Sequence, residues 1–185
     1  MRKCVVVNLF GTPSAGKSTG AAYIFSMLKM AGINAELVTE YAKDKVWEEN
    51  GEVFNNPDNQ VYIFGKQFYR MSRCADKVSV IVTDSPLPIS IIHNHSDILG
   101  ENFNNMVTDC FNSFDNMTYL LTRDKPYNPK GRYETEAEAD ALGTVITTVL
   151  DKMGASYETL KGNLDSYNKV FNDVMAKLTA AQNNE

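Results

Sequence analysis

The chain has 185 residues, of which 43% are hydrophobic and 22% charged, and its formal net charge is −5. These values exclude a disordered or fibrous chain and predict a single globular domain over residues 1–185. No apolar run approaches the ~20 residues that a membrane span needs, so we expect no membrane partner. The three cysteines contain no C-x-x-C pair. Their arrangement argues against a disulfide framework or a thiolate zinc site, and it favours the cytoplasm.

Apolar runs of strand length alternate with amphipathic helical patterns along the chain. The runs predict strands over residues 5–10, 35–39, 78–83, 117–122 and 156–160. Helices are predicted over residues 17–30, 56–77, 97–112, 135–152 and 164–178, the fourth opened by the capping box Thr135-x-x-Glu138. This alternation predicts an α/β fold, a doubly wound parallel sheet with helices on both faces. In such sheets ligands bind at the carboxyl ends of the strands.

Two of these helices have a predicted core face. For the helix over residues 56–77 the core positions are Val61, Phe64, Phe68, Met71 and Ala75. For the last helix they are Leu164, Tyr167, Phe171, Val174 and Leu178. Both sets follow helical spacing, so each predicts a helix that packs on the sheet through one face.

A glycine-rich loop follows the first predicted strand. Residues 11–18, GTPSAGKS, match G-x-x-x-x-G-K-[ST], the pattern of the P-loop. In this loop backbone amides bind phosphate oxygens, Lys17 reaches the β- and γ-phosphates, and the Ser18 hydroxyl binds Mg²⁺. A chance turn is the alternative, but the pattern and its strand–helix context agree. We therefore predict an ATP site formed by Gly11, Thr12, Pro13, Ser14, Ala15, Gly16, Lys17, Ser18 and Thr19.

Carboxylates stand where two further predicted strands end. Asp84 follows the strand over residues 78–83 and is predicted to bind or orient the Mg²⁺, although it could only cap the turn before Pro86. Glu40 ends the strand over residues 35–39 and is the candidate to orient or deprotonate an acceptor hydroxyl. Asp44, one helical turn later, is the competing candidate. Glu40 could instead be a helix N-terminal acid that only favours the helix dipole.

Two basic groups complete the candidate site. Residues 123–132, RDKPYNPKGR, predict a lid around residues 123–133 whose Arg123 and Arg132 stabilise charge on the transferred phosphoryl group. A solvated basic loop is the alternative. A second group recurs at helical spacing and could bind nucleic-acid phosphates, or could simply form the solvent face of its helix. It consists of Lys66, Arg70, Arg73 and Lys77.

Four segments together resemble a known family. They are NLFGTPSAGKST, LVTEYAKDKVWE, VIVTDSPLP and LTRDKPYNPKGRYETEAEA. Over most of residues 3–160 the chain resembles the phage branch of P-loop kinase-like AAA proteins, which are related to the nicotinamide riboside kinase domain of the bacterial NAD regulator. Within this branch it is most similar to the kinases that phosphorylate 5-hydroxymethyluridine in phage DNA, an early step of thymidine hypermodification. The resemblance implies an ATP-dependent phosphotransferase with Mg²⁺, with residues 11–19 at the nucleotide, Asp84 near the metal and Arg132 in the lid.

We therefore expect an ATP-dependent kinase that transfers the γ-phosphoryl group to an alcohol hydroxyl in the host cytoplasm. The expected acceptor is the 5-hydroxymethyl group of 5-hydroxymethyluracil in phage DNA. A kinase of a free nucleoside, nucleotide or ribosylnicotinamide remains an alternative, favoured by the small size and the net charge of −5. An ATPase switch is a third possibility, but such proteins usually need a further helical domain.

Overall fold

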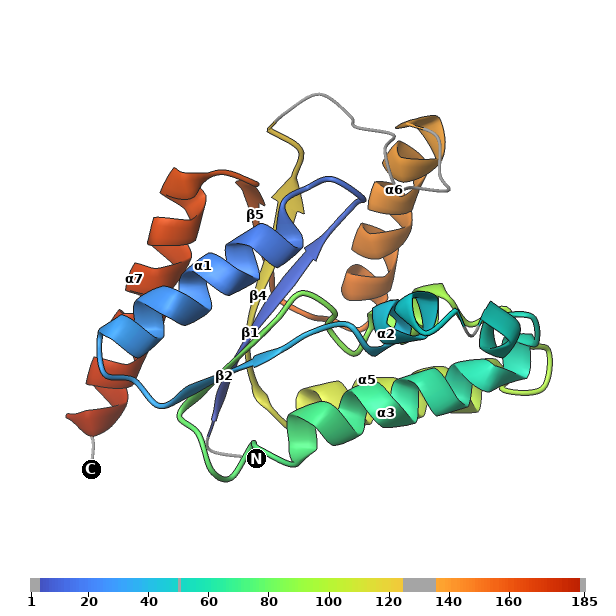
Figure 1. Ribbon diagram of the computed structural model, residues 1–185, viewed down its shortest axis with the longest axis horizontal. Helices are drawn as coiled ribbons and strands as arrows, with labels where there is room; N and C mark the ends of the chain where they lie inside the picture. The colour runs from blue at the N-terminus through green and yellow to red at the C-terminus, as the bar shows by residue number, and fades with distance from the viewer. Residues whose placement is uncertain (1–3, 50, 125–135, 184–185) are drawn as a thin grey trace.

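The computed structural model describes residues 4–49, 51–124 and 136–183 (Figure 1). Within these residues five strands form one sheet in the order β2-β3-β1-β4-β5, and all neighbouring strands run parallel. The strands are β1 (Val5–Gly11), β2 (Ala35–Val38), β3 (Val80–Thr83), β4 (Asp115–Thr122) and β5 (Glu158–Lys161). The predicted parallel α/β fold is confirmed.

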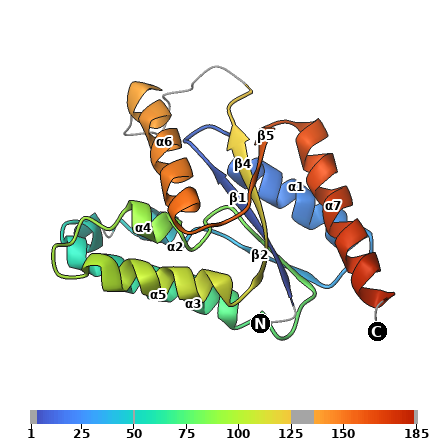
Figure 2. The same ribbon diagram turned by 180° about the vertical axis from the view of Figure 1, so that it is seen from behind.

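Helices cover both faces of the sheet (Figures 1 and 2). One face packs against α1 (Lys17–Met30) and α7 (Leu164–Gln182). The other face packs against α3 (Gln60–Ser72), α5 (Gly100–Asn112) and α6 (Glu136–Lys152). Shorter helices follow β2 and β3: α2 (Tyr41–Trp47), the 3₁₀ helices η1 (Gly51–Phe54) and η2 (Pro57–Asn59), and α4 (Ile89–Ile92). None of the described helices combines the length and the apolar character that crossing a bilayer requires.

The central strand β1 is buried along its whole length. Val7 and Leu9 belong to the core that contains α1 and α7, whereas Val6 and Phe10 belong to the cores on the opposite face. Both faces are covered, so the strand is a continuous apolar run rather than an alternating one. Its polar residue, Asn8, donates to the carbonyl oxygen of Val6 at 3.2 Å and to Asn116 Oδ1 at 2.9 Å.

Some predicted core positions are wrong. Val61 is 44% exposed and Leu164 is 56% exposed. Each lies in the first turn of its helix. The helix predicted over residues 56–77 begins as η2 and continues as α3 only to Ser72. Thr135 of the predicted capping box lies outside the described residues.

The C-terminal part of the chain packs against the back of the P-loop. The Gly162 amide donates to the carbonyl of Thr122 at 2.8 Å, and the Tyr167 hydroxyl donates to the carbonyl of Gly16 at 3.0 Å. A Cβ at residue 162 would overlap the carbonyl oxygen of Ala15. Glycine at this position therefore allows the connection between β5 and α7 to contact the P-loop backbone.

We predict that Gly162→Ala lowers the free energy of unfolding by about 1–3 kcal/mol, because the added methyl group pushes the β5–α7 connection away from the P-loop. Urea denaturation followed by circular dichroism measures the change. Gly65→Ala is the matched control, since residue 65 lies within α3 and a Cβ there meets no atom within 4 Å. The control should gain up to about 1 kcal/mol from helix propensity. Equal stability of Gly162→Ala and the wild type would contradict the close contact.

Candidate functional site

The P-loop connects β1 to α1 through a backbone that repeatedly enters the left-handed region. The φ angles are 150° at Gly11, 67° at Ser14 and 85° at Gly16. At Gly11 a Cβ would also lie 2.6 Å from the carbonyl oxygen of Leu121 in β4. The first glycine of the motif is therefore required by its φ angle and by its contact with the neighbouring strand.

The loop presents donors suited to an anion. Helix α1 begins after Gly16, which provides no side-chain cap, and its first turn contains no acidic residue. The first amides of a helix lack intrahelical partners and favour negative charge. The Lys17 ammonium donates to the carbonyls of Gly11 at 2.8 Å and Thr12 at 3.1 Å, which holds it against the loop. The Ser14 hydroxyl oxygen is buried and has no hydrogen-bond partner among the described residues.

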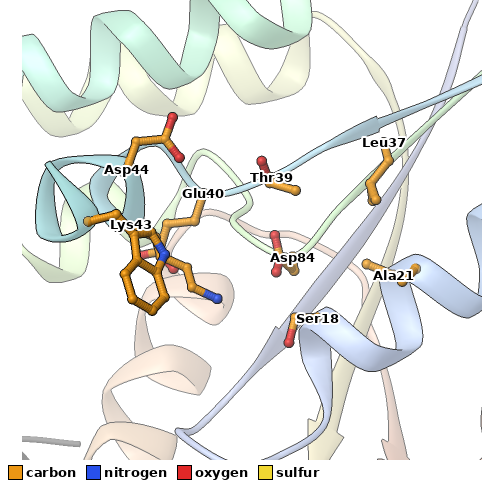
Figure 3. Close-up of a pocket in the computed structure, with 10 residues that line it drawn as sticks. Ser18, Ala21, Leu37, Thr39, Glu40, Lys43, Asp44 and Asp84 are labelled. Atoms are coloured by element: carbon orange, nitrogen blue, oxygen red, sulfur yellow. The ribbon is translucent and has the colours of Figure 1, made fainter. Parts of the chain in front are cut away.

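A cavity of about 320 Å³ lies beside the start of α1. Figure 3 shows the side chains of Ser18, Glu40 and Asp84 lining it. The register of the sheet explains why Glu40 and Asp84 lie at the same cavity. Val38 is paired with Thr83, so the chain leaves β2 and β3 at the same level. The complete lining consists of Ser18, Ala21, Ala22, Leu37, Thr39, Glu40, Lys43, Asp44, Trp47 and Asp84.

Burial raises the pKa of both candidate carboxylates, Glu40 and Asp84. Burial raises the pKa of Glu40, and the charge of Asp84 raises it further, while Lys17 and Lys43 lower it. Burial also raises the pKa of Asp84, opposed by backbone amides and the same two lysines. Asp84 Oδ1 is buried and has no hydrogen-bond partner in the described part of the chain. A buried, unpartnered carboxylate oxygen beside the Ser18 hydroxyl fits Mg²⁺, which binds hard oxygen ligands.

Glu40 and Asp44 differ in their surroundings. Asp44 forms an ion pair with Arg70, which also donates to the carbonyl of Thr39 at 3.3 Å and lies 5.0 Å from the centre of the Tyr41 ring. Glu40 is the N-cap residue of α2, yet its side chain makes no capping hydrogen bond. Glu40 is therefore better placed than Asp44 to act on a ligand in the cavity. These contacts engage Arg70 within the protein, so it does not have the solvent-facing role considered for the basic group Lys66, Arg70, Arg73 and Lys77.

The two predicted lid arginines can be placed only in part. Arg123 follows the end of β4 and is half-buried. Since Gly11 is paired with Leu121, Arg123 leaves the sheet at the edge from which the P-loop also leaves. Arg132, with residues 125–135 of the predicted lid, lies outside the described residues.

Sequence reasoning missed three side chains around this cavity. Lys43 and Trp47 lie one turn apart on α2 and line the cavity, and Trp47 is 75% exposed. Gln67 of α3 is buried and bonded to the loops that carry Glu40 and Asp84. The i, i+4 spacing of Lys43 and Trp47 after Glu40 is a signal that could have identified the first two.

Comparisons with known proteins agree with this architecture. Two solved structures of NadR match with 17% identity: the complex with NR at a TM-score of 0.67, and the complex with NAD and AMP-PNP at 0.66. Each match covers 95% of this chain but only 51% and 49% of the respective NadR chain, so this chain spans about half their length. The crystal structure of APE1195 matches with 18% identity and a TM-score of 0.53, covering 95% of this chain and 97% of that one.

These likenesses show the fold, that of a P-loop NTPase with a five-stranded parallel sheet. A comparison with curated proteins finds no match. A family model described as an AAA domain matches residues 6–166. Because this match extends over most of the chain, the protein belongs to the AAA domain family.

Proposed function

We propose that the protein is an ATP-dependent kinase that transfers the γ-phosphoryl group to an alcohol hydroxyl. The observation that carries the proposal is the juxtaposition of the P-loop with a carboxylate-lined cavity. Ser18 belongs to both, and Glu40 and Asp84 face it from the ends of β2 and β3. A nucleotide in the loop would therefore place its terminal phosphate beside a second bound molecule, which is the geometry that phosphoryl transfer requires.

Each residue then has a distinct task. Backbone N–H groups of residues 11–19, except Pro13, which has none, and the Lys17 ammonium bind the triphosphate. Ser18 and Asp84 would hold Mg²⁺, which neutralises charge on the β- and γ-phosphates when bound. Glu40 accepts the proton of the acceptor hydroxyl while the hydroxyl oxygen bonds to the γ-phosphorus. The bond between the γ-phosphorus and the oxygen that bridges it to the β-phosphate breaks, which releases ADP. The raised pKa of Glu40 makes it a stronger base than an ordinary carboxylate.

The acceptor is proposed to be a nucleoside unit, and specifically the 5-hydroxymethyl group of 5-hydroxymethyluracil in phage DNA. The sequence resemblance supports 5-hydroxymethyluracil as the acceptor nucleobase. The cavity of about 320 Å³ matches a ligand of nucleoside size. Leu37 and the exposed Trp47 offer apolar surface to a planar ring, whereas Lys43 offers a donor. A base stacked in a duplex cannot reach this cavity, so the substrate is a flipped base or a single strand.

A kinase of a free nucleoside, nucleotide or ribosylnicotinamide is the second candidate. It is favoured by the fold likeness to NadR, which has been solved with NR and with AMP-PNP. The ion pair of Arg70 with Asp44 also favours it, because this arginine is engaged within the protein rather than presented to DNA phosphates.

Transfer of label from γ-labelled ATP distinguishes these candidates. The acceptors are DNA containing 5-hydroxymethyluracil, the same DNA with thymine, free 5-hydroxymethyldeoxyuridine and ribosylnicotinamide. Label in the first alone supports the DNA kinase. Label only in a small acceptor overturns the DNA substrate and supports the second candidate. ATP hydrolysis with no labelled acceptor favours an ATPase switch.

We predict that Lys17→Ala lowers the transfer rate by about 10²–10³, because it removes charge stabilisation of the transferring phosphoryl group. The residue also bonds the carbonyls of Gly11 and Thr12, so the melting temperature is measured alongside to separate loss of catalysis from loss of structure. Lys29→Ala, at the exposed end of the same helix, is the control and should retain activity. Wild-type turnover in folded Lys17→Ala would contradict the P-loop assignment.

We predict that Glu40→Gln lowers kcat for transfer by about 10²–10⁴ while ATP affinity is kept, since the residue acts on the acceptor. In the wild type the rate should rise with pH through the raised pKa of Glu40, where the carboxylate loses its proton. Glu40→Gln should lack this rise. Asp44→Asn removes a carboxylate from the same cavity and is the control. If Asp44→Asn abolishes the rise instead, the role of base passes to Asp44.

A further inference from the structure

The side chain of Gln67 joins the two loops that carry the candidate carboxylates. Its Oε1 accepts a hydrogen bond from the Tyr41 amide at 2.9 Å, and its Nε2 donates to the Ser85 carbonyl at 3.1 Å. Tyr41 directly follows Glu40, and Ser85 directly follows Asp84. One carboxamide is therefore bonded to the peptide groups beside both acids.

The position of Gln67 in α3 is otherwise a core position. Its neighbours one turn away, Phe64 and Met71, belong to the hydrophobic core, and Gln67 itself is only 4% exposed. Burying an amide is unfavourable unless its donor and its acceptor are both hydrogen-bonded. Gln67 satisfies this condition through the two loops, so its polar end is matched to them rather than to the core.

The loop that follows β2 and contains Glu40 is less constrained by the sheet than the loop that follows β3 and contains Asp84. Strand β3 lies inside the sheet between β2 and β1, whereas β2 is an edge strand of four residues. The last paired residues of the two strands are Val38 and Thr83. Beyond that pair, the Gln67 carboxamide fastens the loop of the edge strand to the loop of the inner strand. Loss of the carboxamide would therefore displace Glu40 more than Asp84.

We propose that Gln67 is a positioning residue that holds Glu40 against the acceptor hydroxyl by fastening the start of α2 to the Ser85 carbonyl. This inference rests on the proposed kinase function. Gln67 lines no part of the cavity, so its effect on transfer is exerted through Glu40. Displacing a catalytic group by about 1 Å commonly lowers a rate by about 10²-fold.

The test is a double-mutant cycle with Glu40→Gln, using ATP and the acceptor found for the wild type. Gln67→Met keeps the length of the side chain and removes both hydrogen bonds. It should lower kcat by about 10–100-fold with unchanged ATP affinity. In the Glu40→Gln background the same change should lower kcat less than about threefold, because there is no longer a carboxylate to position.

Two further variants separate positioning from stability. Met71→Ala creates a cavity in the core under the same helix, so it should lower the melting temperature and leave kcat unchanged below that temperature. Gln67→Glu keeps the acceptor for the Tyr41 amide and removes the amide donor to the Ser85 carbonyl. It replaces Gln67→Met in the double-mutant cycle if Gln67→Met does not fold. Its loss of kcat should likewise disappear in the Glu40→Gln background.

The outcomes separate a failure of the proposed kinase function from a failure of the proposed role of Gln67. If the wild type phosphorylates no acceptor, the kinase function is overturned and this inference with it. If the wild type is active but Gln67→Met keeps its kcat, Gln67 is not a positioning residue. An equal loss in both backgrounds also overturns the inference, since it would show that Gln67 does not act through Glu40.

Discussion

The burial of β1 on both faces is the constraint on which the rest of the structure depends. All seven of its residues are buried, and it pairs with β3 on one side and β4 on the other. Gly11 is both the last residue of this strand and the first residue of the P-loop. The position of the loop is therefore fixed by the hydrophobic core and by the contact of Gly11 with the Leu121 carbonyl.

The site contains two carboxylates, Glu40 and Asp84, whose charges the neighbouring lysines compensate only in part. Burial raises the pKa of both Glu40 and Asp84 above the values expected in an unfolded chain. Each carboxylate therefore weakens the native state as pH rises from its unfolded pKa through its higher folded pKa, and this loss is absent at lower pH. Lys17 and Lys43 offset part of it. Such a balance is typical of sites whose residues are arranged for a ligand rather than for stability.

Local signals predicted the parts of the site that lie close together in the sequence. The P-loop follows from one eight-residue pattern, α1 follows from the helical spacing of its apolar residues, and the parallel sheet follows from the alternation of apolar runs with helical periods. The strand order and the Gln67 contacts depend on pairing between distant segments, which no local pattern records. Arg70 shows the same limit, because helical spacing placed it on a solvent face whereas its partner Asp44 belongs to another helix. Helices α2 and α4 have seven and four residues, too few for a periodic pattern.

The contact between the P-loop and the β5–α7 connection has a consequence for how the protein is made. Residues 11–17 leave the ribosome early, but Gly162 and Tyr167, which pack against Ala15 and Gly16, are synthesised much later. Contacts between residues so far apart in sequence form slowly, because a long loop must close first. A nascent chain that ends before this connection therefore contains the P-loop sequence without the backbone contacts that the connection makes with it. The backbone of the P-loop can therefore gain these contacts only after residues 162–167 have been synthesised.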